Sequence, residues 1–123
     1  MHRLVLGISG ASGMPLAQAV LENLATVSDL EVHLIISAGA EWVLQAECGI
    51  PSAALARYAH AVHESSDMAA GPSSGSWHHD GMSICPCSMS SLASIASGAG
   101  SNLIHRAADV TLKERRPLVI VAP

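Results

Sequence analysis

Aromatic side chains and charges are both scarce in this sequence. The 123 residues include two tryptophans, one tyrosine and no phenylalanine. Charged residues make up 13% of the chain, about half the usual share for a soluble domain. The core must therefore be built from aliphatic side chains, and part of the surface is expected to be buried against a partner, which indicates an oligomer.

Positive charge, long apolar runs and a zinc motif are lacking as well. Six Lys and Arg residues against ten Asp and Glu residues give a net charge of −4, which argues against a nucleic-acid-binding protein. No apolar run reaches the roughly 18 residues of a membrane span. The three cysteines suit a cytoplasmic protein, and Cys85 and Cys87 are too close in sequence for a zinc knuckle, so no metal site is predicted.

Apolar runs alternate with segments of helical spacing along the chain. Strands are predicted at residues 3–8, 29–36, 61–63, 81–86 and 117–122, and helices at residues 14–25, 38–48, 52–59, 88–97 and 103–114. Ser52 is expected to cap its helix. This alternation predicts an α/β fold with a mostly parallel sheet that is covered on both faces. No helix follows the last strand, so we expect the chain to be the front part of a longer protein.

The segment 65–80 has no periodicity and is rich in Ser, Gly and His. A loop of this length in a small domain is expected to be either functional or poorly ordered. Trp77 would either cover a flat ring or prenyl chain, or anchor the loop. The adjacent His78 and His79 should point in different directions, and their roles stay open.

The strongest local signal is the sequence GISGASG at residues 7–13, between a predicted strand and a predicted helix. Glycines let the backbone approach a ligand, and the helix start offers N–H groups to a phosphate. The spacing differs from the dinucleotide pattern, and Ser37 stands where an NAD-binding protein carries an acidic residue. The pattern favours a phosphate or nucleotide other than NAD, with a tight turn without a ligand as the alternative.

Two further groups of polar residues are candidates for ligand binding. Ser37 and Ser88 each follow a predicted strand, and Ser91 lies one helical turn after Ser88, although Ser88 could simply cap its helix. Arg106 and Lys113 lie on one face of a predicted helix, which suits a phosphate-bearing substrate.

An ion pair on the surface of this helix is the alternative to phosphate binding. Asp109 and Lys113 are four residues apart, so they could pair on a solvated face. Arg115 and Arg116 are expected to complement the C-terminus of the same helix.

Five segments together identify a family. They are GISGASG at 7–13, SSGSW at 73–77, DGM at 80–82, CPCSM at 85–89 and NLIHRAADVTLKERRPL at 102–118. In this order they resemble the UbiX-type flavin prenyltransferases, a phenylacrylic acid decarboxylase-like flavoprotein family. The resemblance runs the whole length of the chain.

This resemblance implies a three-layer Rossmann-like (flavoprotein) fold that binds FMN. It implies alkylation of FMN at N5 and C6 by dimethylallyl phosphate, without a metal ion. The prenylated FMN would serve a UbiD-type decarboxylase, and the protein would be a cytoplasmic homo-oligomer such as a dodecamer. The family continues beyond Pro123 with residues that complete the substrate-phosphate pocket. The chain is therefore expected to lack its C-terminal part, where the sheet would be incomplete.

The resemblance also assigns roles to individual residues. Ser12 and Glu47 would lie beside N5 and assist proton movement, and Arg106 and Lys113 would hold the substrate phosphate. FMN would be contacted by Gly10, Ala11, Ser12, Ser37, Ser88, Met89, Ser90 and Ser91. Many members carry Lys-Thr or Gly-Thr where Ser90-Ser91 stands, so this contact departs from the family.

Two alternatives stay open beside this function. The first is a non-catalytic FMN-binding subunit or a truncated relic associated with an aromatic-acid decarboxylase. The second is a cysteine-type decarboxylase of the same superfamily. It is disfavoured because residues 87–90, CSMS, replace the Asn-containing motif of such enzymes.

Overall fold

A parallel sheet lies at the centre of the computed structural model, which describes residues 1–123. Its order is β3-β2-β1-β4-β5, and every neighbouring pair is parallel. The strands are β1 (His2–Ile8), β2 (Leu30–Ile36), β3 (Ala61–Glu64), β4 (Gly81–Ile84) and β5 (Leu118–Ile120). The prediction of a mostly parallel sheet is therefore confirmed.

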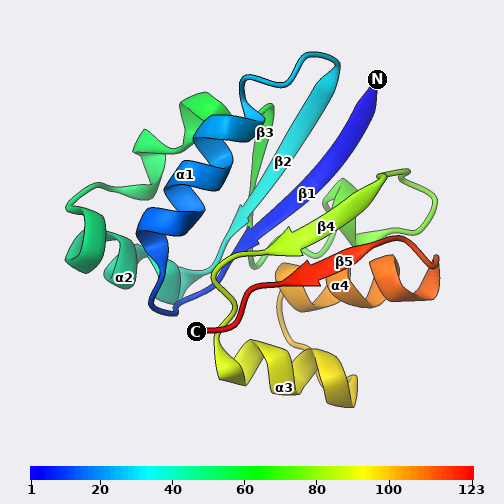
Figure 1. Ribbon diagram of the computed structural model, residues 1–123. Coiled ribbons are helices and arrows are strands. Elements are labelled where there is room, and N and C mark those ends of the chain that lie inside the picture. Colours follow the sequence, from blue (N-terminus) through cyan, green and yellow to red (C-terminus); the bar gives the residue numbers. More distant parts are fainter.

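Two pairs of helices cover the two faces of the sheet (Figure 1). α1 (Met14–Leu24) and α2 (Ala38–Cys48) lie on one face, whereas α3 (Met89–Ser97) and α4 (Leu103–Lys113) lie on the other. These three layers are the predicted Rossmann-like architecture. None of the helices is both long and apolar enough to cross a membrane.

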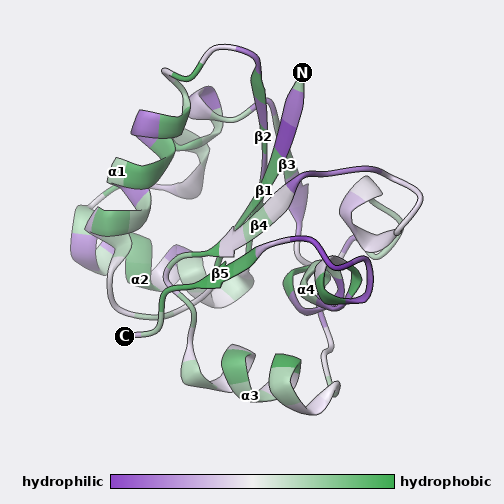
Figure 2. Cartoon of the chain, turned by 45° about the vertical axis from the view of Figure 1, so that its right-hand side comes forward, coloured by the Kyte–Doolittle hydropathy of each residue, from purple (hydrophilic) through white to green (hydrophobic).

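Each face of the sheet has its own aliphatic core. Leu6 and Leu34 point toward α1 and α2, while Val5 and Ile35, their neighbours in sequence, point toward α3 and α4. This alternation follows from the two-residue period of a strand that is buried on both faces. α4 shows both green apolar and purple polar residues in Figure 2, and its apolar side packs on β4.

The region after α2 differs from the predicted helix at 52–59. It forms two short 3-10 turns, η1 (Ser52–Ala54) and η2 (Ala56–Tyr58), and Ser52 does not cap either of them. Instead, the N–H and hydroxyl of Ser52 both donate to the carboxylate of Glu41. The Ser52 hydroxyl is therefore held by Glu41 of α2, and it does not accept an N–H of η1.

The segment 65–80 crosses the molecule from the carboxyl end of β3 to the amino end of β4, and it contains the 3-10 turn η3 (Gly71–Ser73). Trp77 packs edge-on against His33, with ring centroids 4.9 Å apart. The Arg3 guanidinium lies 4.4 Å from the centre of the Trp77 ring. Trp77 therefore anchors the loop, and it does so near the amino ends of the strands.

His79 and Arg116 lock the end of the same loop to α4. The buried His79 is bonded through Nε2 to the Thr111 hydroxyl at 2.9 Å, while Arg116 donates to His79 Nδ1 at 3.1 Å and to the Gly75 carbonyl at 3.2 Å. The Arg116 N–H does complement the α4 C-terminus, because it donates to the Thr111 carbonyl at 2.9 Å, but the guanidinium binds the loop and not the helix end. His78 is exposed, so the two neighbouring histidines do diverge.

Candidate functional site at the carboxyl edge of the sheet

Three loops meet where the central strands end. They follow β1, β2 and β4, and comprise residues 9–13, 37–40 and 85–91. From β1 the chain builds outward through β2 to β3, and then returns to the other side for β4 and β5. The reversal between β1 and β4 is the position where open α/β sheets bind ligands. We call these three loops the edge loops.

The edge loops contact one another closely. A Cβ added to Gly10 would lie 3.0 Å from the carbonyl carbon of Gly39, so the loop after β1 reaches α2 only because residue 10 is glycine. The buried Ser9 joins the loop after β1 to the loop after β4. Its hydroxyl donates to the Pro86 carbonyl at 3.0 Å and accepts the Ser88 N–H at 2.7 Å.

Glu47 reaches from α2 to the start of α1. Its Oε1 accepts the N–H groups of Gly13 and Met14 at 3.0 and 2.9 Å, and its Oε2 accepts the Ser12 hydroxyl at 2.7 Å. The Met14 N–H, followed by the Ser12 hydroxyl and the Gly13 N–H, holds the pKa of Glu47 below its ordinary value. Glu47 is therefore a carboxylate at neutral pH, and it orients the lone pairs of Ser12 away from itself.

This carboxylate changes the interpretation of the glycine loop. The first N–H groups of α1 were expected to bind a phosphate, but Gly13 and Met14 donate to Glu47. Pro15 has no N–H, and the N–H of Leu16 donates to the Gly13 carbonyl at 3.1 Å. The start of α1 has no donor left for a phosphate, because an internal anion already occupies it.

The starts of α2 and α3 retain the free donors. Ser37 caps α2 by accepting the Ala40 N–H, and Ser88 caps α3 by accepting the Ser91 N–H at 3.1 Å. The capping interpretation of Ser88 is thus confirmed. Within the chain no acceptor faces the N–H groups of Ala38, Gly39, Met89 and Ser90. Four donors at two positive helix ends suit a phosphate.

The remaining predicted residues of α3 differ in exposure. Met89 is 61% exposed and offers an apolar surface beside the free N–H groups. Ser90 is exposed, whereas Ser91 is buried and its hydroxyl lies 3.0 Å from Nε2 of His105 on α4. Ala11 is buried within the loop after β1.

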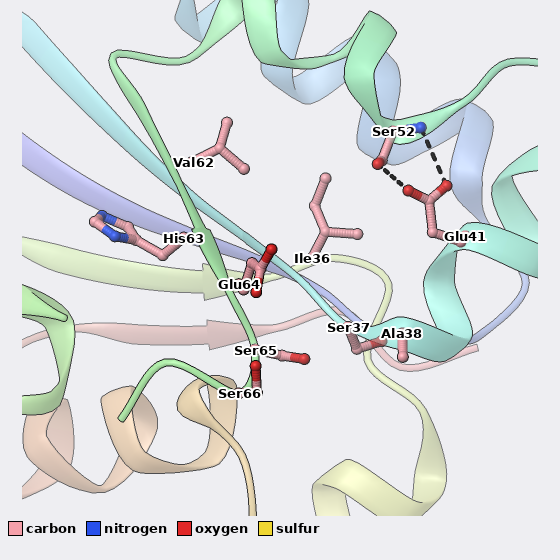
Figure 3. A pocket seen from close by; sticks show the side chains of 10 residues that line it. All are labelled: Ile36, Ser37, Ala38, Glu41, Ser52, Val62, His63, Glu64, Ser65 and Ser66. Atoms are coloured by element: carbon pink, nitrogen blue, oxygen red, sulfur yellow. Dashed lines mark hydrogen bonds between the residues drawn. The ribbon is translucent and has the colours of Figure 1, made fainter. Parts of the chain in front are cut away.

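A pocket of about 450 Å³ adjoins Ser37 on the β3 side of the edge loops (Figure 3). Ser37 is the only predicted site residue that lines it. The other lining residues come from β2, α2, η1, β3 and the start of the 65–80 segment: Ile36, Ala38, Glu41, Ser52, Val62, His63, Glu64, Ser65 and Ser66. The pocket therefore extends the candidate site toward a wall that is rich in hydroxyl groups and carries two carboxylates, those of Glu41 and Glu64.

Lys113 lies apart from the edge loops, whereas Arg106 lies in the first half of α4, next to His105. α4 runs antiparallel to the strands, so that its last residue, Lys113, lies near the amino ends of the strands (Figure 1). Arg106 is exposed, and its Nε donates to the Ser73 carbonyl at 3.0 Å. No ion pair joins Asp109 to Lys113 within 4.0 Å, so the alternative of a helix-surface pair is wrong. Within one chain, Lys113 does not share the site of Glu47.

Sequence reasoning missed two residues of this region, Ser9 and His105. Ser9 is a hydroxyl that directly follows a buried strand, which is a usable signal for a polar link between neighbouring loops. His105 carries no such signal, because its partner Ser91 lies on another helix. No cluster of His, Cys, Asp and Glu side chains has a geometry that could hold a metal ion.

The whole chain, residues 1–123, matches the flavoprotein family. It belongs to this family. Among flavoproteins it is 51% identical over 119 residues to the flavin prenyltransferase UbiX of Deinococcus radiodurans, covering 97% of this chain and 60% of that protein. It is 50% identical over 121 residues to the flavin prenyltransferase LpdB of Lactiplantibacillus plantarum, covering 98% of this chain and 65% of that protein. The resemblance to UbiX-type proteins is confirmed, and the chain spans less than two thirds of their length.

Solved flavoprotein structures have the same fold. A dodecameric FMN-dependent UbiX-like decarboxylase from Escherichia coli O157:H7 superposes with a TM-score of 0.96 at 41% identity, covering 98% of this chain and 66% of that chain. AnUbiX (PadA1) in complex with FMN and dimethylallyl pyrophosphate superposes with a TM-score of 0.94 at 45% identity, covering 98% and 64%. The cysteine decarboxylase TvaF is only 12% identical at a TM-score of 0.74, which shows a shared fold alone.

Proposed function

We propose that this chain binds FMN at the edge loops and that the protein is a flavin prenyltransferase. It would join the dimethylallyl group of dimethylallyl phosphate to N5 and C6 of reduced FMN. The observation that carries this proposal is the Ser12–Glu47 pair at the ligand-binding edge, in a chain that is about half identical to flavin prenyltransferases.

The donors of the edge loops fit FMN. The phosphate would take the N–H groups at the starts of α2 and α3, with hydroxyls of Ser37, Ser88, Ser90 and Ser91 around it. Gly10, Ala11 and Ser12 would contact the flavin by backbone approach, and the exposed side chain of Met89 would cover part of its ring.

Ser12 and Glu47 would accept a proton beside the flavin. Bound reduced FMN would supply the nucleophilic N5 and C6 atoms. The bond to N5 would form as the C–O bond of the donor breaks and phosphate leaves, and the bond to C6 would form at the prenyl double bond, which takes up one of the two protons that N5 and C6 lose while phosphate takes the other. The Ser12 hydroxyl already donates to Glu47, so its lone pairs can accept a proton from a bound group. Glu47 would take the hydroxyl proton in turn, because its low pKa keeps it ionised and able to accept.

Arg106 and Lys113 would neutralise the substrate phosphate of a neighbouring subunit. Lys113 lies at the end of α4 that is far from the edge loops of its own chain, and the Arg106 guanidinium is bonded to the Ser73 carbonyl at η3. A homo-oligomer resolves this separation, and a dodecamer is the arrangement of the UbiX-like relative from Escherichia coli. The scarcity of charge on the surface is consistent with such burial.

The product would be prenylated FMN for a UbiD-type decarboxylase. We also propose a cytoplasmic protein, since all three cysteines are free and two of them are buried.

Mass spectrometry of the flavin tests the proposed reaction. The protein is incubated with chemically reduced FMN and dimethylallyl phosphate under anaerobic conditions, and the flavin is then extracted. We expect an adduct heavier than FMN by one prenyl unit, and recovery of unmodified FMN alone from a protein that spans the full length of its relatives would refute the transfer activity.

A non-catalytic FMN-binding subunit is the second candidate. It is favoured by the distance of Lys113 from the edge loops, because a chain that does not assemble would lack cations at its own site. In that case the wild-type chain and Lys113→Ala both bind FMN, and neither forms an adduct.

A further inference from the structure

The buried contact between Ser91 and His105 joins the predicted FMN-binding segment of α3 to α4. The two side chains are 6% and 5% exposed, and His105 Nε2 lies 3.0 Å from the Ser91 hydroxyl oxygen. No other side chain is bonded to that hydroxyl. Which atom donates depends on the tautomer of His105.

The turn before α4 determines this tautomer. The Ser101 N–H donates to His105 Nδ1 at 3.0 Å, so Nδ1 must be the unprotonated nitrogen. The approach requires glycine at position 100, because a Cβ there would come closer to the His105 side chain than Cβ atoms come to other atoms in proteins. Neutral His105 therefore carries its proton on Nε2 and donates it to Ser91 Oγ.

The surroundings of His105 keep it neutral. Burial lowers the pKa of His105, and Asp109 on the same helix opposes this with a smaller effect. α3 and the turn at 98–102 carry no charged side chains. Protonation would also put a hydrogen atom on Nδ1, where it would face the hydrogen of the Ser101 N–H and break this hydrogen bond.

A hydroxyl that accepts one hydrogen bond still has its own proton to donate. The Ser91 hydroxyl has no acceptor for this proton within the chain. We propose that His105 is a positioning residue, which orients the Ser91 hydroxyl as a hydrogen-bond donor to an acceptor atom of bound FMN. This inference rests on the proposed binding of FMN at the edge loops.

FMN titrations of four variants test the coupling. Dissociation constants are measured by quenching of flavin fluorescence for the wild-type chain, Ser91→Ala, His105→Phe, His105→Gln and the double variant Ser91→Ala/His105→Phe. Loss of one buried hydrogen bond should weaken binding about tenfold in each of the first two variants. The double variant should bind no more weakly than Ser91→Ala, since His105 acts through Ser91. His105→Gln should retain most of the affinity because its amide nitrogen can replace Nε2.

Proton–nitrogen correlation NMR of the wild-type chain gives a second readout that needs no FMN. We expect neutral His105 with its proton on Nε2 at pH 7, and a proton on Nδ1 would overturn the inference. Additive losses in the double variant would overturn it as well, while the proposed function stands. A wild-type chain that binds no FMN would overturn the proposed function and this inference together.

Discussion

Acidification should weaken the fold chiefly through His79. Burial, followed by the charges of Arg116 and His78, lowers the pKa of His79 from 6.5 to about 4. In the unfolded chain the same imidazole binds a proton near pH 6.5. Between these values only the unfolded state takes up the proton, so stability is complete above pH 6.5 and falls as the pH drops toward 4.

The size of this loss follows from the shift. At about 1.4 kcal/mol per pKa unit, with an allowance for partial screening, the free energy of unfolding should fall by about 2 to 3 kcal/mol between pH 7 and pH 4. Protonation would also remove the Nδ1 acceptor from Arg116, which joins the 65–80 segment to the start of β5. The loop should therefore loosen before the sheet does.

Urea unfolding at pH 7, 5 and 4 measures the effect. His79→Gln keeps a donor for Thr111 but cannot titrate, so its stability should fall by about 2 to 3 kcal/mol less than that of the wild type over this range. His60→Gln is the matched control, because His60 is 61% exposed and lies outside this network. Equal pH slopes for the wild type and His79→Gln would refute the assignment of this loss to His79.

Three further outcomes are expected. Glu47→Gln should leave FMN affinity nearly unchanged but slow prenyl transfer about a hundredfold, measured as adduct formed per minute, since the amide cannot take a proton from Ser12. Lys113→Ala should raise the KM for dimethylallyl phosphate about tenfold while the Kd for FMN stays constant, and an unchanged KM would remove it from the phosphate site. Gly10→Ala should cost about 1 to 3 kcal/mol in thermal unfolding and weaken FMN binding, because its Cβ would meet Gly39. Gly39→Ala is its control, since that Cβ would lie at an ordinary 3.9 Å from Gly10.

Features that depend on neighbours along the chain were predictable. The strands at 2–8 and 30–36 stood out as apolar runs, and the helix at 38–48 was predicted with its observed bounds. The cap formed by Ser88 was readable as well, because a capping hydroxyl acts on an N–H only three residues away. The parallel sheet followed from the order of these elements.

Features that depend on distant partners were not predictable from local pattern. In the sequence Glu47 is an isolated carboxylate. The fold brings it to Ser12 and to the start of α1, where it takes the N–H groups that the glycine spacing had suggested for a phosphate. Arg116 found its acceptors in the 65–80 segment.

The sequence by itself therefore determined the layers, the strand ends and the membership of the flavoprotein family, since these follow from periodicity and short motifs. Only the tertiary structure decided which donors remain free for a ligand. A hydrogen bond across the edge loops joins residues that are far apart in sequence, so the local sequence does not reveal that its donor and acceptor are already bonded. The same holds for His105, whose tautomer depends on Ser101 and whose partner Ser91 lies on another helix.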